Sequence, residues 1–306
     1  MRFPSTIGSL NLFMRHQGPS GARRGRPVLI LHGATFPSSN AASWKIGSRS
    51  WMDELAAAGY DVYALDFLGY GESDRYPEMA AEASAGTPLG GIESMVAQVE
   101  CAVAEILKAH GGERINLVAH SAGTFVAARF AQLHPDRLER LVLFGAPAPS
   151  EGPSPKPAST ERYLQISRAD QLNAFEPKVR ESQHLDGTMF EAWATAYLAT
   201  DPHGGDRQPR SVRVPAGMNA AFDDMERLGQ LPYDPKRITT PVLVIQGEWD
   251  AVAPVSAGLW LYNRLGSPLK RFVVIGQAGH RAHLENNRRQ LYRETETFLN
   301  GGDSAD

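Results

Sequence analysis

The sequence has a single cysteine, no long apolar run and little excess of charge of either sign. With Cys101 alone, an internal disulfide and a metal site built from several cysteines are both excluded. A formal net charge of −3 over 306 residues gives no sign of a nucleic-acid or polyanion partner. No apolar stretch approaches the roughly 20 residues of a membrane-spanning helix, and residues 1–26 contain no apolar signal core. We therefore expect a soluble, cytoplasmic protein with no membrane span and no nucleic-acid partner.

Most of the chain alternates between short apolar runs and amphipathic stretches. The predicted strands are residues 10–15, 27–32, 60–66, 115–119, 138–144, 241–246 and 270–275. The predicted helices are residues 51–58, 94–110, 122–132, 255–265 and 288–299. This alternation predicts an α/β fold with a doubly wound, mostly parallel sheet, in which the first strand lies at an edge.

The alternation stops between residues 147 and 238. A Pro- and Ser-rich stretch, 147–157, opens this interval, and helix-like patterns follow at 190–198 and 218–228. A chain of 306 residues is long enough for one large domain that carries an insertion. We therefore expect a mainly helical segment inserted between two core strands, with the core formed by residues 1–146 and 239–306.

The most informative stretch joins a predicted strand to a predicted helix at Ser121. Its sequence is Ala119-His120-Ser121-Ala122-Gly123, with a small residue two positions before the serine and glycine two positions after it. A sharp strand-to-helix turn strains the backbone and leaves no room for large neighbours, and it exposes the serine hydroxyl above the strand ends. The pattern is that of a nucleophile elbow, with Ala119 where the first glycine usually stands. An ordinary turn with a capping serine is the alternative interpretation.

Two later strand ends carry groups that can activate this hydroxyl. A serine nucleophile needs a base, and the base needs a group that fixes its tautomer. Asp250 follows the predicted strand 241–246, and His280 follows the predicted strand 270–275. Because the carboxyl ends of parallel strands meet at one edge of a sheet, we expect both side chains beside Ser121.

Both of these assignments have a neighbouring alternative in the sequence. Glu248 precedes Asp250 by two residues and is a second candidate for the orienting acid. His283 follows His280 by three residues and is a second candidate for the base. Position in the loop favours Asp250, and His283 lies closer to the last predicted helix, so we favour His280.

Five pieces of sequence, taken in chain order, match one known family. They are His32-Gly33, Asp66-x-x-Gly69-x-Gly71-x-Ser73-Asp74, Ala119-His120-Ser121-Ala122-Gly123, Gly247-x-x-Asp250 with Pro254, and Gly279-His280 with Leu284-Glu285. Over nearly its whole length the chain resembles the α/β-hydrolase family. The resemblance implies that Ser121 is the nucleophile, His280 the general base and Asp250 the orienting acid. Relatives that open epoxides or cleave carbon–halogen bonds carry aspartate in place of Ser121, so those activities are disfavoured.

The resemblance also implies an oxyanion hole, a cap and no cofactor. The backbone N–H groups of Ala122 and Ala34 would bind the oxyanion, with Thr35 as the alternative to Ala34. The inserted segment 147–238 would cover the active site as a cap or lid. Neither a metal nor an organic cofactor would take part in the reaction.

Three other polar sites in these pieces are interpreted as structural. We expect His32 to brace the loop that follows it through its ring nitrogens, and His120 to be hydrogen-bonded away from the strained turn. The glycine-rich stretch that ends in Ser73 and Asp74 is interpreted as a turn, with one of these two residues capping a helix.

The inserted segment contains candidate substrate-pocket residues, which are Trp193, Phe222 and Met218. These side chains recur near helical spacing together with Phe190, Tyr197 and Met225. They form either the segment's own small core or, in part, an apolar pocket over Ser121. The three arginines within 206–213 either bind a substrate carboxylate or belong to a solvated loop, and we favour the loop.

The expected reaction is the cleavage of a carboxylic ester in a small-molecule acyl substrate through an acyl-enzyme. The same three side chains also serve acyl transfer, thioester or amide cleavage and hydrolysis of a carbon–carbon bond. A ligand-sensing protein with slow turnover is the alternative outside the enzymes. Neither the substrate nor the oligomeric state follows from the sequence, because fold alone does not choose a substrate.

Overall fold

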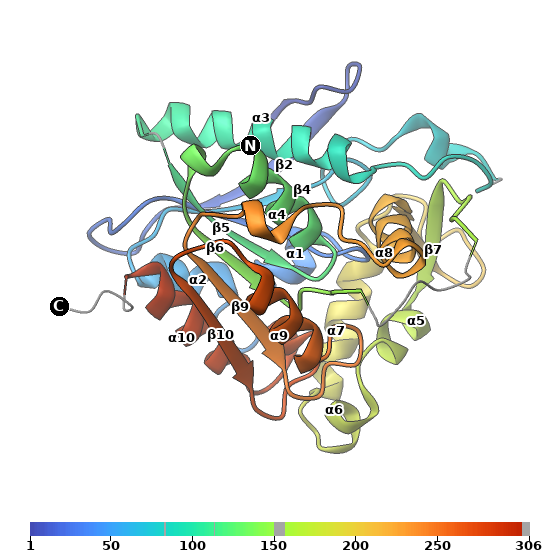
Figure 1. Cartoon of the computed structure of the whole chain (residues 1–306). Coiled ribbons are helices and arrows are strands. Elements are labelled where there is room, and N and C mark those ends of the chain that lie inside the picture. The colour runs from blue at the N-terminus through green and yellow to red at the C-terminus, as the bar shows by residue number, and fades with distance from the viewer. Residues whose placement is uncertain (83, 113, 150–156, 302–306) are drawn as a thin grey trace.

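The central strands are mostly apolar because both faces of the sheet are covered. In the computed structural model, which describes residues 1–82, 84–112, 114–149 and 157–301, eight strands form one sheet in the order β1-β2-β4-β3-β5-β6-β9-β10 (Figure 1). The strands are β1 (Arg2–Pro4), β2 (Asn11–Gln17), β3 (Val28–Leu31), β4 (Val62–Asp66), β5 (Ile115–His120), β6 (Leu138–Phe144), β9 (Val242–Gly247) and β10 (Lys270–Ile275). All neighbouring pairs from β4 to β10 are parallel, which confirms the predicted fold class.

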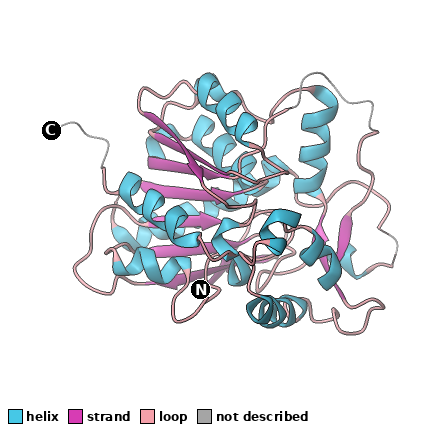
Figure 2. Ribbon diagram, turned by 90° about the horizontal axis from the view of Figure 1, so that it is seen from below, coloured by secondary structure: helices cyan, strands magenta, loops and turns pink. Residues whose placement is uncertain are grey.

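Helices cover the two faces of this sheet and create two hydrophobic cores (Figure 2). One face packs against α2 (Trp51–Ala57) and α10 (Arg288–Leu299), and the other against α3 (Ile92–His110), α4 (Gly123–Leu133) and α9 (Val255–Arg264). In strand β3, successive side chains point to opposite faces of the sheet. Val28 and Ile30 belong to the first core, whereas Leu29 and Leu31 belong to the second.

The edge position predicted for residues 10–15 is wrong. These residues lie in β2, which pairs antiparallel with β4 on one side and with β1 on the other. The true edge strand, β1, has only three residues, ends in Pro4 and pairs through Phe3 with Leu12. Three residues are too few to show an alternating pattern, and for this reason the sequence gives no sign of β1.

The helix-cap role predicted for Ser73 or Asp74 is also wrong. Ser73 Oγ accepts the N–H of Phe13 at 2.7 Å and donates to the carbonyl of Asp66 at 2.5 Å. The Asp74 carboxylate accepts the backbone N–H of Asn11 at 2.7 Å. Both side chains thus tie the turn to β2 across the sheet, and neither caps a helix. The short 3₁₀ helix η1 (Pro77–Ala80) begins after Tyr76 without a side-chain cap.

The segment 147–238 lies between β6 and β9 in the sequence and beside the carboxyl ends of the strands (Figures 1 and 2). It contains β7 (Tyr163–Ser167), α5 (Arg168–Asn173), α6 (Pro177–Glu181), α7 (Gly187–Leu198), β8 (Ser211–Pro215), α8 (Gly217–Leu228) and η3 (Pro235–Arg237). The helix patterns at 190–198 and 218–228 correspond to α7 and α8. The antiparallel pair β7–β8 was not predicted, because each strand has only five residues. Most of the Pro- and Ser-rich stretch, residues 150–156, lies outside the described residues.

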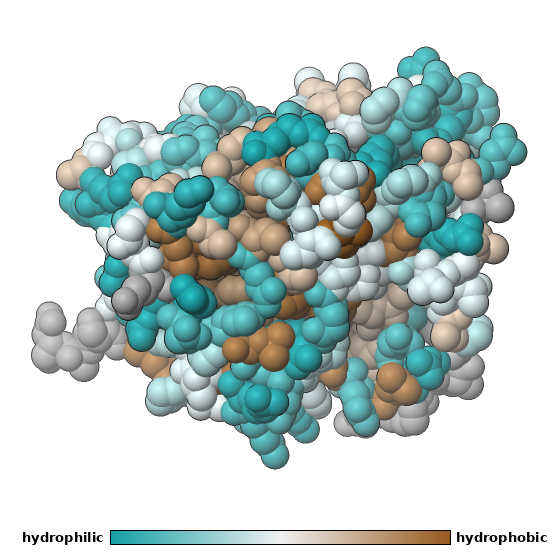
Figure 3. Space-filling model, turned by 90° about the horizontal axis from the view of Figure 1, so that it is seen from above, coloured by the Kyte–Doolittle hydropathy of each residue, from teal (hydrophilic) through white to brown (hydrophobic). Residues whose placement is uncertain are grey.

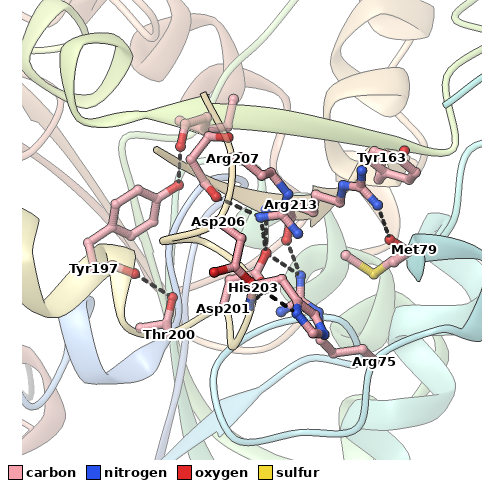
Figure 4. A network of polar contacts seen from close by, with 12 residues as sticks. Arg75, Met79, Tyr163, Tyr197, Thr200, Asp201, His203, Asp206, Arg207 and Arg213 are labelled. Atoms are coloured by element: carbon pink, nitrogen blue, oxygen red, sulfur yellow. Dashed lines mark hydrogen bonds and ion pairs between the residues drawn. The ribbon is translucent and has the colours of Figure 1, made fainter. Parts of the chain in front are cut away.

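A buried carboxylate, Asp201, organises the arginines that follow α7 (Figure 4). Asp201 Oδ2 accepts from Arg207 at 2.7 Å, from the backbone N–H of Arg213 at 2.9 Å and from Arg75 at 3.3 Å. Burial acts to raise the pKa of Asp201, but these hydrogen bonds outweigh it and lower that pKa. Arg213 also donates to the main-chain carbonyls of Met79 and Ala81. Arg75 and Arg213 therefore join the segment to the core, whereas Arg207 links Asp201 to Ser211 within the segment.

The remaining short elements and the surface add little to the architecture. The remaining short helices are α1 (Ser38–Ala41), η2 (Pro135–Arg137) and η4 (Ala282–Leu284). Hydrophilic residues predominate on the face shown in Figure 3, with small separate hydrophobic patches. No helix in the part of the chain that the structure describes combines the length and apolar character needed to cross a membrane.

Candidate active site

Ser121 stands at a strained turn between β5 and α4. Its φ angle of 54° lies in the left-handed region, which a residue other than glycine adopts only where the surroundings impose it. The Ser121 N–H donates to the carbonyl of Phe144 at 2.9 Å, so the turn is attached to the end of β6. A Cβ on Gly123 would lie 2.3 Å from the carbonyl oxygen of His32. The sequence therefore needs glycine at 123 for the turn to approach the loop after β3.

The loops after β9 and β10 bring Asp250 and His280 to this serine. His280 Nε2 lies 2.7 Å from Ser121 Oγ, and His280 Nδ1 lies 2.8 Å from Asp250 Oδ2. The other carboxylate oxygen of Asp250 accepts the backbone N–H groups of Val252 and Ala253 at 2.9 and 2.7 Å. With Nδ1 donating to the carboxylate, the lone pair of Nε2 faces the serine hydroxyl. This arrangement can remove the hydroxyl proton.

A second glycine, Gly145, makes room for the imidazole ring of His280. Gly145, which follows β6, has a φ angle of 61°, and a Cβ there would lie 3.1 Å from His280 Cε1 and 3.2 Å from His280 Nδ1. Both the backbone conformation and the close approach of the ring favour glycine at this position. The sequence of β6 and its following turn thus contributes to the placement of His280, although it supplies no functional side chain.

The alternative acid and base lie apart from this chain of contacts. Glu248 Oε2 accepts the N–H of Gln277 at 2.7 Å and braces that residue at its positive φ of 55°. His283 is buried among the rings of Phe36, Trp51 and Phe144, and neither of its nitrogens has a hydrogen-bond partner among the described residues. Of these four side chains, Asp250 and His280 are the two that connect to the Ser121 hydroxyl.

The loop after β3 presents the candidate oxyanion-hole donors. His32 Nδ1 lies 2.7 Å from the carbonyl oxygen of Gly33, and His32 Nε2 accepts the N–H of Phe67 at 3.3 Å. The Tyr70 hydroxyl donates to the carbonyl of Ala34 at 2.6 Å. Since N–H and C=O of a trans peptide point in opposite directions, these bonds fix the N–H groups of Ala34 and Thr35. His32 braces the loop as expected, while the choice between Ala34 and Thr35 stays a prediction.

Three histidines near Ser121 are held neutral by burial. Burial lowers the pKa of His32, lowers the pKa of His120 far below its usual value, and lowers the pKa of His283 to about 3. His120 Nε2 lies 2.8 Å from the carbonyl oxygen of His280, so its ring supports the main chain of the neighbouring loop. This is the hydrogen-bonded structural role expected for His120.

Two buried glutamates support the loops that carry Asp250 and His280. Glu176, from the segment between α5 and α6, accepts the N–H of His280 at 3.0 Å and the N–H of Ala251 at 3.2 Å. Glu285 accepts the N–H of Gly279 at 3.0 Å, and burial raises the pKa of its carboxyl group to about 8. Glu176 was not predicted as a site residue, because nothing in its local sequence indicates a partner 104 residues away.

A cavity of about 250 Å³ opens at the Ser121 hydroxyl. Its lining residues are Gly33, Ala34, Thr35, Phe36, His120, Ser121, Ala122, Ala174, Met218, Asn219, Phe222, Val252, His280 and Arg281. Met218 and Phe222 therefore lie where the pocket interpretation expects them, and their contact with a substrate stays a prediction. Sequence analysis missed Phe36, Asn219 and Arg281, which belong to no motif. Among the described residues, no three His, Cys, Asp or Glu side chains gather as ligands for a metal ion.

Trp193, the third candidate pocket residue, does not line this cavity. Its ring stacks on Phe190 and Tyr197 of the same helix, with centroids 5.9 and 5.4 Å apart. Its indole N–H donates to the carbonyl of Asn40 at 2.9 Å. Trp193 belongs to the core between α7 and α1 and packs edge-to-face on Phe36, with centroids 5.3 Å apart, whereas Phe36 itself lines the cavity.

Comparisons with known proteins agree with this architecture. A family model described as alpha/beta hydrolase fold matches residues 26–287. The chain belongs to this family. This α/β hydrolase is 29% identical over 279 residues to the 2-hydroxy-6-oxononadienedioate/2-hydroxy-6-oxononatrienedioate hydrolase of Paraburkholderia phymatum, with 90% of this chain and 87% of the relative covered.

Two further relatives have similar names. The 2-hydroxy-6-oxo-2,4-heptadienoate hydrolase of Pseudomonas putida is 28% identical over 277 residues, which cover 86% of each protein. The solved structure of a meta-cleavage product hydrolase from Pseudomonas fluorescens superposes with a TM-score of 0.63 and 19% identity, covering 96% of each chain. At this level of identity the structural likeness shows the fold alone.

We expect the variant His283→Phe to resist acid better than the native α/β hydrolase. The pKa of His283 is about 3 in the fold, and that of an unfolded histidine is about 6.5. The unfolded chain therefore binds an extra proton below about pH 6.5, and the stabilisation present above that pH is lost as the pH falls.

Urea unfolding at pH 7.5 and 5.5 measures this effect. The difference in unfolding free energy between variant and native protein should shift by about 1.4 kcal/mol in favour of the variant at the lower pH, which corresponds to one proton over one pH unit. An unchanged difference would mean that His283 takes up its proton without unfolding.

Proposed function

We propose that this α/β hydrolase uses Ser121 as a nucleophile to cleave a carbon–carbon bond beside a ketone, in an acid of the 2-hydroxy-6-oxo-dienoate type. The serine mechanism is carried by one observation, the short contacts from Ser121 Oγ through His280 to Asp250 at 2.7 and 2.8 Å. The bond type is supported by the full-length relatives, whose names describe 2-hydroxy-6-oxo-dienoate hydrolases. Those names favour carbon–carbon bond hydrolysis over the ester cleavage expected from the sequence.

The first chemical step uses the geometry at the turn. His280 Nε2 takes the proton of Ser121 Oγ, and the oxygen attacks the ketone carbon. The carbonyl oxygen becomes an oxyanion that accepts hydrogen bonds from the N–H groups of Ala122 and Ala34. The positive charge that forms on His280 is stabilised by Asp250, whose carboxylate is fixed by two backbone N–H groups.

The second step breaks the bond to the dienoate carbon. In the 2-oxo tautomer of such a substrate, the electron pair of this bond passes into the conjugated acid, which makes carbon a feasible leaving group. His280 returns its proton to the leaving fragment, and the acyl group stays on Ser121 as an ester. Water, deprotonated by His280, then hydrolyses this ester and frees the serine. Protons and electrons balance with water as the only co-reactant, so no cofactor enters the proposal.

The segment 147–238 acts in this proposal as a cap. Ala174, Met218 and Phe222 of the segment line the same cavity as Ser121 and add apolar surface to its wall. Glu176 of the same segment hydrogen-bonds the loops of both Asp250 and His280. The cap would therefore shield the cavity from bulk solvent and also hold the base in position. The cytoplasmic location stays a prediction.

Two substrates that deliver the same acetyl group test the choice of bond. Cleavage beside the ketone of 2-hydroxy-6-oxo-2,4-heptadienoate releases acetate, and hydrolysis of 4-nitrophenyl acetate releases acetate too. We expect kcat/KM for the dienoate to be higher by roughly tenfold or more, which is about 1.4 kcal/mol of transition-state stabilisation. A preference for the ester would favour an esterase, and a stall after one turnover would favour a ligand-sensing protein.

The nucleophile is tested by labelling and by substitution. A fluorophosphonate probe should attach to Ser121, because the hydroxyl beside His280 is the activated one. Ser121→Ala should lose on the order of 10⁶-fold in kcat, as serine triads of other hydrolases do. Mass spectrometry of the labelled peptide and steady-state kinetics measure the two effects. Labelling of another serine would contradict the assignment.

The orienting acid is tested by a matched pair of amide substitutions. Asp250→Asn should lower kcat on the order of 10⁴-fold, since an amide at this position favours the wrong tautomer of His280. Glu248→Gln should change kcat little, because its carboxylate accepts the N–H of Gln277 in an exposed turn and forms no bond to His280 in the described part of the chain. Thermal melting of both variants shows whether the fold is kept. A large loss for Glu248→Gln alone would identify Glu248 as the acid.

A further inference from the structure

Arg281 is a buried cation in the wall of the Ser121 cavity. It follows His280 directly in the sequence, only 5% of its surface is exposed, and it lines the cavity with Ser121. One guanidinium nitrogen donates to the main-chain carbonyl of Gln171 at 2.8 Å. No Asp or Glu in the described part of the chain forms an ion pair with it. A buried charge without an ion-pair partner is costly, and such groups mark sites that receive an opposite charge.

Aromatic rings hold the guanidinium group in a fixed plane. Its central carbon lies 5.2 Å from the ring centre of Phe36 and 5.0 Å from that of Phe175. Cation–π attraction to two rings offsets part of the desolvation cost. In the described part of the chain the Gln171 carbonyl accepts from one guanidinium nitrogen, which leaves further N–H donors of the group for a planar acceptor. Phe36 lines the same cavity, so this clamp belongs to the pocket wall.

The nearby glutamates form no ion pair with Arg281 in the described part of the chain. Glu285 is a neighbour, but burial raises its carboxyl pKa to about 8, so it is largely uncharged at pH 7. Glu176 acts from beyond ion-pair distance: its charge acts to raise the pKa of Arg281, while one of its oxygens accepts the N–H groups of His280 and Ala251. Burial lowers the pKa of Arg281 to about 10, which still leaves the side chain positively charged at pH 7.

We propose that Arg281 binds the carboxylate of an anionic substrate and selects such substrates over neutral ones. The inference rests on the proposed function for the identity of the acid, whereas the anion preference concerns any substrate of the cavity. A carboxylate matches the fork of N–H donors on a guanidinium group. Because Arg281 adjoins His280, the bound carboxylate would fix the distance between the charged end of the substrate and the carbonyl at Ser121.

A matched pair of acetyl esters tests the preference for an anionic substrate independently of which type of bond the protein cleaves in its own substrate. 4-Acetoxybenzoate and 4-acetoxybenzamide deliver the same acetyl group and differ in the charge of the leaving fragment. We expect the native protein to prefer the anion in kcat/KM, and Arg281→Met to reduce this preference by about 10- to 100-fold, the range of a charged hydrogen-bonded pair. Arg281→Lys should restore part of the preference, because it restores the charge without the fork.

Arg168→Met is the matched control, because it also removes an arginine that lies against an aromatic ring. Arg168 also lies over a ring, that of Phe190 at 5.4 Å, but it is paired with Glu191 and does not line the cavity. The preference should be unchanged in this variant. Inhibition of the native protein by benzoate but not by benzamide gives a second readout that needs no variant, in case Arg281→Met fails to fold.

The outcomes separate this inference from the proposed function. Equal losses on the anionic and neutral esters, or equal inhibition by benzoate and benzamide, would show that Arg281 only joins the segment to the core and would overturn the inference. If the dienoate is not cleaved but the ester preference depends on Arg281, the proposed reaction fails and the inference stands. If the dienoate is cleaved equally well by Arg281→Met, the inference fails and the reaction stands.

Discussion

The site depends on the close packing of three main-chain turns at the carboxyl ends of β3, β5 and β6. Ser121 keeps its positive φ of 54° because its N–H is bonded to the end of β6 and its turn presses on the loop after β3. Gly123 and Gly145 permit this contact, one against the carbonyl of His32 and the other against the ring of His280. A side chain at either position would separate turns whose spacing sets the hydrogen bond between serine and imidazole. The strain at Ser121 is thus maintained by the sheet itself.

Around these turns the protein buries many polar groups and keeps most of them uncharged. His120 and His283 are neutral because burial disfavours the imidazolium form, and burial also raises the carboxyl pKa of Glu285. Charged side chains that remain close to the reacting atoms include Asp250, Glu176 and Arg281. In a site of low polarity, a few fixed charges act strongly on a developing charge, since little solvent is present to screen them. The neutral neighbours therefore leave the field at Ser121 to a small number of fixed groups.

Much of the architecture could be predicted because it depends on local pattern. Strands buried on both faces are apolar runs, and the turn at Ser121 needs small neighbours that are visible in the sequence. The short strands β1, β7 and β8 were missed because three to five residues carry no clear period. Trp193 was misplaced because helical spacing identifies an apolar face but not what that face packs against. Glu176 and Arg281 act through tertiary contacts with distant segments, which no local pattern encodes.

The substrate could not be predicted for a chemical reason. The charged groups near His280 indicate which part of the site would recognise it. Ser121, His280 and Asp250 can attack any acyl carbon, so they do not distinguish an ester from a ketone. The leaving group and its charge make that distinction, and they are recognised by the cavity wall. Arg281 follows His280 directly in the sequence and places a buried positive charge in that wall. A substrate carboxylate on Arg281 would therefore select an anionic substrate and also set how far its charged end lies from the carbonyl at Ser121.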